Sequence, residues 1–475
     1  MKQKTTKVKT MLPSTMHNWQ EGSIIDITID DVGHAGEGVG RYANRPVFVP
    51  GGIPGDHLQV KLTQVHKRYA HASLLKVLHS CAQRVTPMCS EFGRCGGCQL
   101  QQWNYQAQLA WKQERLVQTL ARVGGIRQVL IRSIIPAPRQ WAYRNKAQFP
   151  VGMYEGKPAL GFYRYGSHEL VPVTDGCHIV HPLIGRAAAI IDKHLPTLGS
   201  VYDERTGRGV LRHVVMRVGF HSEQLLITFV CQQPNLAGLP TLITKLQEAM
   251  PQLVGVTINI NNKSGNRIMG AEDITVWGRD YIEERLHTGG GSLLFHVSAR
   301  SFFQVNPMQA ERLYQVVARY AVVDDNAKVL DAYCGTGSIA LYLAQAGAAA
   351  VWGVEEETAA VHDAQINAQL NNVSNVRFYA GKVEEIVAEL VRKGNAPNVV
   401  VVDPPRSGCD AEFLATACSW QAERWVYVSC NPATLARDMR IIMDNGYNVV
   451  EAQPVDMFPH TAHVECVVLM ERVGK

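Results

Sequence analysis

Long apolar runs are missing from this chain of 475 residues. No stretch approaches the about 20 apolar residues that a membrane helix needs. Residues 1–16 carry Lys2, Lys4, Lys7 and Lys9 but no apolar core. We therefore expect no membrane span, no signal peptide, a disordered basic arm at 1–16 and a cytoplasmic protein. A content of 46% hydrophobic and 19% charged residues is typical of a soluble globular chain, and its length predicts two or three domains.

Acidic residues are missing from one stretch of the sequence. Five cations and no Asp or Glu lie there: Lys61, Lys67, Arg68, Lys76 and Arg84. This local excess exists although the net charge is only +5. It indicates a surface that faces a polyanion, although a solvated basic face explains the charge equally well.

Residues 17–78 are strand-like, with short alternating segments and glycines where the chain turns, as in Gly36-Glu-Gly-Val-Gly40. This pattern predicts a small all-β barrel of the five-stranded OB type, a fold that often binds nucleic acid. Helical spacing of apolar residues follows at 101–123. Residues 79–290 are expected to form a central α+β domain.

From residue 291 to 475, strands and helices alternate, which predicts a Rossmann-like α/β domain with a mostly parallel sheet. We expect the last two strands to close the sheet as an antiparallel pair. The predicted strands lie at 328–331, 350–354, 376–379, 398–402, 424–429, 447–455 and 464–471.

A strand, a glycine turn and a helix follow one another in Asp331-Ala-Tyr333-Cys-Gly-Thr-Gly-Ser338. Such a turn lets the backbone approach a ligand closely. The third glycine of a G-x-G-x-x-G loop is missing, and with the acid at Asp331 this favours S-adenosylmethionine over a dinucleotide. Glu355 ends the next strand, where a carboxylate can bind both hydroxyls of an adenosine ribose.

Three further segments place reactive groups at strand ends: Asp403-Pro-Pro-Arg-Ser-Gly, Ser-Cys430-Asn-Pro and His463-Val-Glu465. Methylation of pyrimidine C5 requires a thiolate that adds to C6 and a base that removes the C5 proton. We expect Cys430 to be the nucleophile and Glu465 the base, with the pKa of Cys430 lowered by the start of the following helix. A buried structural cysteine is the alternative.

Cysteines cluster in Cys89-x5-Cys95-x2-Cys98, with glycines between the last two. Three thiols this close indicate metal ligands. Cys177, preceded by glycine, is the best candidate for a fourth. Four thiolates suit zinc or an iron–sulfur cluster, and the spacing does not separate the two. The C-x3-C-x2-C spacing of radical S-adenosylmethionine enzymes is absent, which argues against radical chemistry.

Together these motifs resemble the bacterial RNA m5-uridine methyltransferases, and among them the 23S rRNA (uracil-5-)-methyltransferase family. The resemblance extends from about residue 17 to the end and includes a barrel like a TRAM domain, Cys-Gly-Gly-Cys-Gln-Leu-Gln and Ser301-Phe-Phe-Gln304-Val-Asn-Pro. It implies that Gln304, Tyr333, Glu355 and Asp403 contact S-adenosyl-L-methionine. It also implies a 4Fe–4S cluster on Cys89, Cys95, Cys98 and Cys177.

The resemblance further implies methylation of one or two uridines of 23S ribosomal RNA. We expect a monomer, although the sequence carries no signal for the oligomeric state. Two alternatives stay open. One is a transfer RNA m5U methyltransferase; the other is an iron–sulfur RNA-binding protein whose methyltransferase domain is inactive. A cytosine enzyme is disfavoured, because such enzymes need a second cysteine in the Asp-Pro-Pro region and Cys409 is not in the usual place for it.

Overall fold

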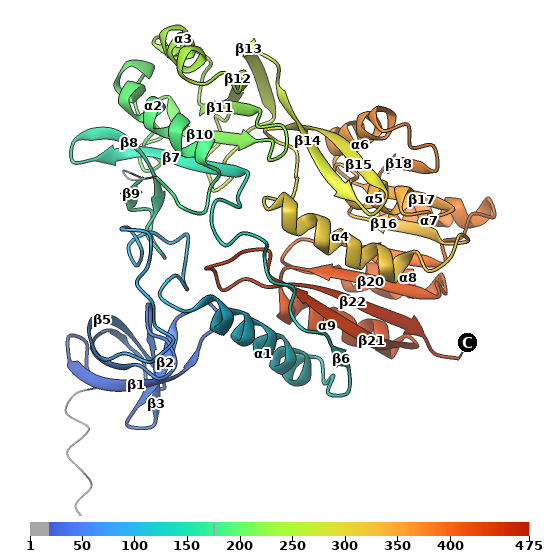
Figure 1. Ribbon diagram of the computed structural model, residues 1–475, viewed down its shortest axis with the longest axis horizontal. Helices are drawn as coiled ribbons and strands as arrows, with labels where there is room; N and C mark the ends of the chain where they lie inside the picture. The colour runs from blue at the N-terminus through green and yellow to red at the C-terminus, as the bar shows by residue number, and fades with distance from the viewer. Residues whose placement is uncertain (1–18, 174–175, 475) are drawn as a thin grey trace, which may run out of the picture. The chain divides into compact units, whose positions relative to one another are not determined.

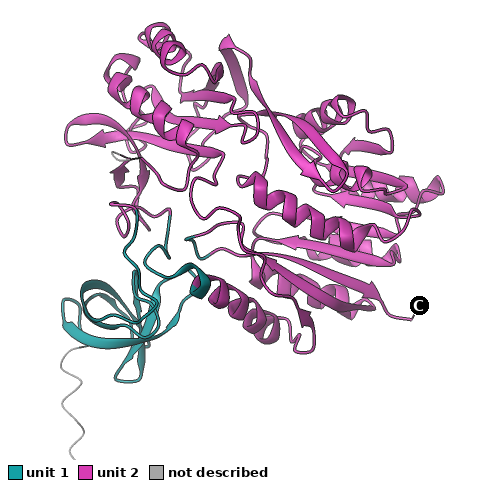
Figure 2. Cartoon of the chain, in the orientation of Figure 1, with its two compact units in different colours: residues 1–88, 98–107, 460–462 teal, residues 89–97, 108–459, 463–475 magenta. Residues whose placement is uncertain are grey.

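The structure is a computed structural model that describes residues 19–173 and 176–474, so the basic arm predicted at 1–16 lies outside the described residues. The chain divides into two compact units (Figure 2). The first contains residues up to 88 together with 98–107 and 460–462, and the second contains 89–97, 108–459 and 463–475. The domain limits predicted at 78 and 290 remain predictions.

The first unit is built on a closed five-stranded barrel with strand order β1-β2-β3-β5-β4, which confirms the predicted barrel. Alternate residues of β1 are buried, as expected when one face of a strand lines a barrel. The apolar interior includes Ile27, Val47 and Leu58. The strands are β1 (Ile24–Val32), β2 (Gly38–Tyr42), β3 (Arg45–Val49), β4 (His57–Val65) and β5 (Ala70–His79).

The second unit contains a seven-stranded sheet of order β13-β12-β11-β10-β7-β8-β9. Helices α2 (Pro182–Leu198) and α3 (Leu239–Ala249) contribute their apolar faces to its core. The strands are β7 (Lys146–Tyr154), β8 (Lys157–Tyr163), β9 (Leu170–Pro172), β10 (Leu211–Val218), β11 (Leu225–Cys231), β12 (Leu253–Ile260) and β13 (Glu272–Gly278). A hairpin of β14 (Tyr281–Thr288) and β15 (Gly291–Ser298) follows, so one supersecondary element crosses residue 290.

An eight-stranded sheet of order β18-β17-β16-β19-β20-β22-β21-β6 forms the other half of the second unit (Figure 1). Its strands β16 to β20 are parallel, and β22 is antiparallel to both β20 and β21. All seven predicted strands are confirmed within one or two residues. They are β16 (Lys328–Ala332), β17 (Ala350–Glu355), β18 (Val376–Ala380), β19 (Val399–Val402), β20 (Arg424–Ser429), β21 (Tyr447–Val455) and β22 (Glu465–Arg472).

The edge strand β6 (Leu130–Ile131) and the helix α1 (Tyr105–Val123) come from the segment predicted as the central domain. Nevertheless, β6 pairs with β21, and Leu116 and Leu120 of α1 lie in the core cluster that packs on the eight-stranded sheet. The helical spacing predicted α1, but a two-residue strand carries no periodic signal.

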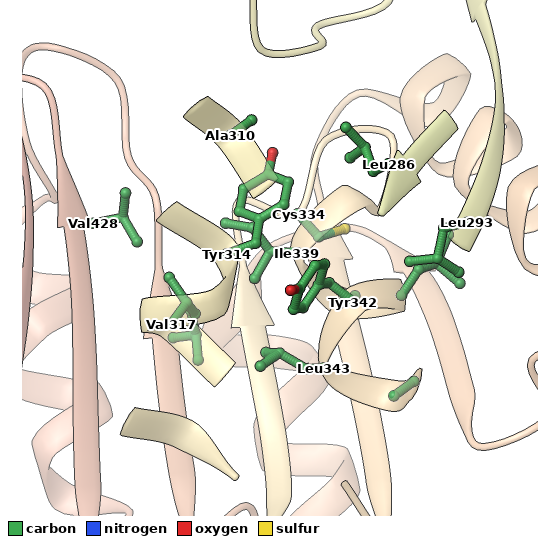
Figure 3. Packing of buried hydrophobic residues seen from close by; sticks show 14 of the residues in the cluster. Leu286, Leu293, Ala310, Tyr314, Val317, Cys334, Ile339, Tyr342, Leu343 and Val428 are labelled. Carbon is green, nitrogen blue, oxygen red and sulfur yellow. The ribbon is translucent and has the colours of Figure 1, made fainter. Parts of the chain in front are cut away.

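The opposite face of this sheet has its own apolar cluster, which Figure 3 shows around Tyr314, Ile339 and Tyr342. Leu226 of β11 and Leu286 of β14 belong to the same cluster, so the seven-stranded sheet and the β14–β15 hairpin both contact the core of the eight-stranded sheet. None of the helices in the described residues is long and apolar enough to cross a membrane. The remaining helices are α4 (Pro307–Ala321), α5 (Ser338–Gln345), α6 (Thr358–Leu370), α7 (Val383–Arg392), α8 (Ala411–Ser419) and α9 (Pro432–Asp444).

Candidate active site

The predicted site residues meet at one edge of the eight-stranded sheet. Glu355, Asp403 and Cys430 stand at or just after the carboxyl ends of the parallel strands β17, β19 and β20. Because β22 runs antiparallel to β20, its first residue, Glu465, lies at the same edge. Ligands of open α/β sheets bind outside this edge. The topology therefore brings together groups that are up to 110 residues apart in the sequence.

The strand register places the predicted nucleophile near the predicted base. The last pair of the antiparallel ladder joins Ser429 of β20 to Cys466 of β22, and Cys430 and Glu465 are the chain neighbours just beyond this pair. The charge of Glu465 acts on the Cys430 thiol, so the two groups lie near each other. Glu465 pairs with Val455 of β21, and this central position keeps its side chain 4% exposed. Cys430 is half-buried.

Burial dominates the protonation of this edge. It raises the pKa of Glu465 to about 8, with Asp403 adding to the rise, and that of Asp403 to about 6. Our prediction that the helix start lowers the pKa of Cys430 is wrong. Burial first, then the negative charges of Glu465 and Asp403, raise this pKa to about 11. The charge of Arg406 and a backbone hydrogen bond offset only part of this rise.

Arg406 is the cation that opposes these shifts. Its positive charge lowers the pKa of both Cys430 and Glu465. The Arg406 guanidinium Nη2 lies 3.4 Å from Nε2 of His463. Burial and the charge of Arg406 lower the pKa of His463 to about 4, so at neutral pH its ring is uncharged and can accept from the guanidinium. Both residues stand inside the quoted motifs, but neither was given a role from the sequence.

The segment after β19 is fastened to α9 by hydrogen bonds. The Asn431 side chain donates to the Arg406 carbonyl (3.0 Å), and Asn431 also caps α9 by accepting from the Ala433 amide (3.1 Å). The buried carboxylate of Asp438 accepts from the Cys409 amide (2.8 Å) and from the Tyr427 hydroxyl (2.6 Å). Two segments that meet only in the fold are thereby held as one rigid edge.

The glycine turn after β16 has the backbone expected of a ligand loop. Tyr333, Gly335 and Gly337 have φ values of 66°, 53° and 81°. The Gly335 amide donates to Oε2 of Glu355 (3.2 Å), which fixes the carboxylate at the end of β17. At Gly337 a Cβ would lie 2.6 Å from the Phe378 ring, so only glycine fits.

Asp331 lies fully buried beneath this turn. Neither of its carboxylate oxygens has a hydrogen-bond donor in ordinary geometry among the described residues. Burial and the charge of Asp403 raise its pKa well above the usual value, and the Ala340 amide offsets only part of the rise. A buried acid with so little hydrogen bonding beside a glycine turn fits a polar ligand seated on that turn.

The backbone at Gln304 is held by Asn145, the residue before β7 of the seven-stranded sheet. The Gln304 carbonyl accepts from the Asn145 side chain (3.4 Å), and the amide of Asn145 donates to the next carbonyl, that of Val305 (2.8 Å). Lys146 donates to the Ala299 carbonyl (3.0 Å), and Arg217 to that of Ser301 (2.7 Å). Asn145 and Lys146 therefore hold the segment before α4 through its backbone carbonyls.

Three of the four predicted cluster cysteines lie in the second unit, and they influence one another. Burial raises the pKa of Cys95 to about 11, and the thiols of Cys177 and Cys89 add to the rise. The Gly97 amide donates to Sγ of Cys95 (3.4 Å), while the amides of Ile179 and Val180 lower the pKa of Cys177. Half-buried sulfurs with amide donors are the surroundings in which thiolate ligands are found. Cys98 belongs to the first unit and is also half-buried.

Comparison with known families supports the methyltransferase geometry. Residues 104–473 match the family described as tRNA (Uracil-5-)-methyltransferase. The chain belongs to this family. It is thus an S-adenosylmethionine-dependent RNA methyltransferase of the m5U type. Residues 18–75 match the TRAM domain, which identifies the barrel.

Individual relatives match this chain over almost all of its length. An RNA methyltransferase of Clostridium acetobutylicum is 41% identical over 453 residues, which are 95% of this chain and 97% of that protein. One of Bacillus cereus is 39% identical over 460 residues, 96% of this chain and 98% of that protein. The crystal structure of the Pyrococcus abyssi tRNA (uracil-54, C5)-methyltransferase in complex with S-adenosyl-L-homocysteine is 27% identical. Its TM-score is 0.76, over 94% of this chain and 99% of that one.

Proposed function

We propose that this enzyme methylates C5 of uridine in 23S ribosomal RNA, with Cys430 as nucleophile and Glu465 as base. The observation that supports the assignment of roles is that Cys430 and Glu465 directly follow and precede the paired residues Ser429 and Cys466, at the carboxyl edge of the sheet, where the charge of Glu465 acts on the Cys430 thiol. On this proposal Gln304, Tyr333, Glu355 and Asp403 bind the methyl donor. Their support is the positive φ of Tyr333, the fixed Glu355 carboxylate and the position of Asp403 after β19.

In the proposed mechanism the thiolate of Cys430 forms a bond to C6 of an extruded uracil. The C5=C6 electron pair moves toward the C4 carbonyl and makes C5 nucleophilic. C5 then bonds to the sulfonium methyl of S-adenosylmethionine, whose carbon–sulfur bond breaks to leave S-adenosylhomocysteine. Glu465 takes the C5 proton, the C5=C6 bond re-forms, and the C6–S bond breaks to return the thiolate.

The raised pKa values fit a site that is completed by its substrates. In the free enzyme, burial keeps the Glu465 carboxyl and the Cys430 thiol largely protonated at neutral pH. A sulfonium cation bound beside Asp403 would stabilise both anions, as Arg406 already does. The site would then ionise when the donor is present, which protects the thiol in its absence.

The 4Fe–4S cluster on Cys89, Cys95, Cys98 and Cys177 is part of the same proposal. Its support is the mutual influence of Cys89, Cys95 and Cys177 and the amide donors to sulfur. When bound, such a cluster would stabilise the segments that carry its ligands. Protein purified without oxygen should be brown and contain about four irons per chain. A colourless protein with one zinc would overturn this assignment.

Transfer RNA is the second candidate substrate, because the Pyrococcus abyssi enzyme whose structure matches 94% of this chain acts on tRNA. Ribosomal RNA is favoured by the resemblance of the cysteine motif to that of the 23S rRNA enzymes. The barrel does not separate the two substrates, because the match to the tRNA enzyme covers 94% of this chain. Both RNAs from cells without this protein should be incubated with the enzyme and a labelled donor. Label in 23S RNA alone supports the proposal, and label in tRNA alone overturns the choice of substrate.

The chemistry is tested separately with RNA that contains 5-fluorouridine. Fluorine at C5 cannot leave as a cation, so the adduct on Cys430 should persist and appear by mass spectrometry as a peptide–nucleotide crosslink. If the crosslink formed at another residue, the assignment of the nucleophile would be wrong.

A further inference from the structure

We propose a second metal site, unrelated to the cysteine cluster, that binds a divalent transition metal of the zinc type through His221, His287 and Glu311. One imidazole nitrogen from each histidine and a carboxylate oxygen all lie within 4.8 Å of one another. Three protein ligands at zinc are spaced about 3.3 Å apart when each bond is about 2.0–2.1 Å long. Small side-chain rotations would therefore complete the site.

The three ligands come from three different elements. His221 lies in the turn between β10 and β11, His287 near the end of β14, and Glu311 in the first half of α4. Nε2 of His221 is 3.3 Å from Oε1 of Glu311, and the two imidazole rings meet edge to face with centroids 4.7 Å apart. The side chains of His221 and Glu311 are 24% and 19% exposed, whereas His287 is exposed, so the three ligands lie at the surface where a metal ion can reach them.

Neighbouring groups fix the backbone of these ligands. The buried carboxylate of Glu284 accepts from the amides of Phe220 and His221, the latter at 3.0 Å, and so holds the turn between β10 and β11. The His287 amide donates to Oε1 of Glu311 (2.7 Å). Orienting hydrogen bonds of this kind are typical of metal centres.

The core beneath the site is also rigid. Leu286 precedes His287 and Ala310 precedes Glu311, and both belong to the apolar cluster of Figure 3. The cage is thus anchored on packed elements rather than on loops alone. A simple ion pair between His221 and Glu311 would explain two of the residues, but it gives no reason for the imidazole of His287 at the same point.

Two imidazoles and one carboxylate suit zinc and its neighbours in the first transition series, and a set of three leaves a position for water. The position in the fold indicates what the metal would do. It would join the turn of the seven-stranded sheet, the β14–β15 hairpin and α4, and α4 follows directly after the segment with Gln304. Metal binding would therefore stabilise the connection between the seven-stranded sheet and the carboxyl edge of the eight-stranded sheet.

The test uses the full chain, purified anaerobically and passed over a chelating resin, titrated with Zn²⁺ and with Co²⁺. Wild-type protein should bind one equivalent more than His287→Ala and Glu311→Gln. Glu311→Gln keeps an oxygen that can accept from the His287 amide but removes the negative charge. The extra Co²⁺ should absorb without thiolate-to-metal charge-transfer bands, which separates it from metal on the cysteines.

Zn²⁺ should also raise the melting temperature of wild type by about 2 °C or more, because it binds only the folded state. This rise should be lost in both variants. The matched control is His168→Ala, which removes the histidine of an exposed His–Glu pair at 3.1 Å (His168 with Glu204). It should behave as wild type. Equal metal binding and equal thermal shifts in wild type, His287→Ala and Glu311→Gln would overturn the proposal.

Discussion

Charged side chains are buried at the carboxyl edge of the eight-stranded sheet in the second unit but mostly exposed on the barrel of the first unit. At the edge, Asp331 and Glu465 are buried, and burial raises the pKa of each. On the barrel, four of the five cations predicted to face a polyanion are exposed: Lys61, Lys67, Lys76 and Arg68. A buried charge depends strongly on each neighbour, whereas exposed charges are screened and act almost independently.

The fifth barrel cation shows the difference within one domain. Arg84 donates to the fully buried carboxylate of Asp56 at 2.6 Å, and Asp56 also accepts from the amides of Ile53 and Cys81. Arg84 therefore stabilises the fold of the first unit and does not face a polyanion. Position in the fold, and not residue type, decides whether a charge serves structure, chemistry or attraction of RNA.

The largest effect is expected at the sheet edge from Cys430→Ala. Without the sulfur no bond to C6 can form and C5 stays unreactive, so methyl transfer should fall below detection. Donor binding, measured by calorimetry, should be retained. Cys81→Ala, which removes a half-buried thiol of the first unit, is the control and should leave turnover unchanged. Methylation by the Cys430→Ala protein would refute the covalent mechanism.

Glu465→Gln should follow, with a loss of about 10²–10⁴-fold in turnover, the usual contribution of a general base. Attack by Cys430 and methyl transfer remain possible, so the methylated RNA should accumulate as a covalent adduct that survives denaturing gel electrophoresis. If turnover fell without any adduct, proton removal would not be the role of Glu465.

The same side chain should cost stability as the pH rises. Burial holds the pKa of Glu465 at about 8, against an ordinary value of 4.5. The folded state therefore retains a proton that the unfolded chain releases, and this contribution to stability is lost as the pH rises from about 4.5 through about 8. The melting temperature of Glu465→Gln minus that of wild type should therefore increase from pH 5 to about pH 9. A constant difference would mean that Glu465 is not held protonated.

A smaller effect is expected from Arg406→Gln. Removal of this cation should raise the pKa of both Cys430 and Glu465, since Arg406 lowers each of them. The single-turnover rate should therefore rise at a higher pH in this variant than in wild type. At neutral pH the rate should be about tenfold lower for each pH unit by which the profile is displaced. Arg377→Gln changes an exposed arginine on the edge strand β18 and should not displace the profile. An unmoved profile in Arg406→Gln would show that its charge is not felt at the site.

Much of this architecture was predictable from the sequence because its signals are local. Glycine turns and apolar strands indicated β16 to β22, and the rule that parallel strands share a carboxyl edge joined Asp403 to Cys430. The antiparallel closing pair then brought Glu465 to the same edge.

Other features depend on depth and on distant partners, which a linear pattern does not contain. The helix start after Cys430 was visible, but the burial and the opposing carboxylates that raise its pKa were not. The pairing of β6 with β21 and the packing of Lys146 on Ala299 likewise join segments with no shared motif. Arg84 carried the same charge signal as Lys67, and only the buried Asp56 separates them.

The smallest effect is expected on the barrel surface and tests this last distinction. Lys67 and Arg68 are exposed at the β4–β5 turn, next to Tyr69, whose ring stacks on His66 at 4.4 Å. Changing both to alanine should weaken RNA binding several-fold. It should also reduce the slope of the logarithm of the binding constant against the logarithm of the salt concentration by about 0.7–0.9 for each phosphate that the protein no longer neutralises.

The control is Arg84→Ala, which also removes one positive charge. It should lower the melting temperature because Asp56 is left buried and unpaired. The folded fraction of Arg84→Ala should keep the wild-type salt dependence of RNA binding. If the salt dependence fell in proportion to the charge removed in both the Lys67/Arg68 double variant and Arg84→Ala, the barrel would attract RNA by net charge alone and not through a defined face.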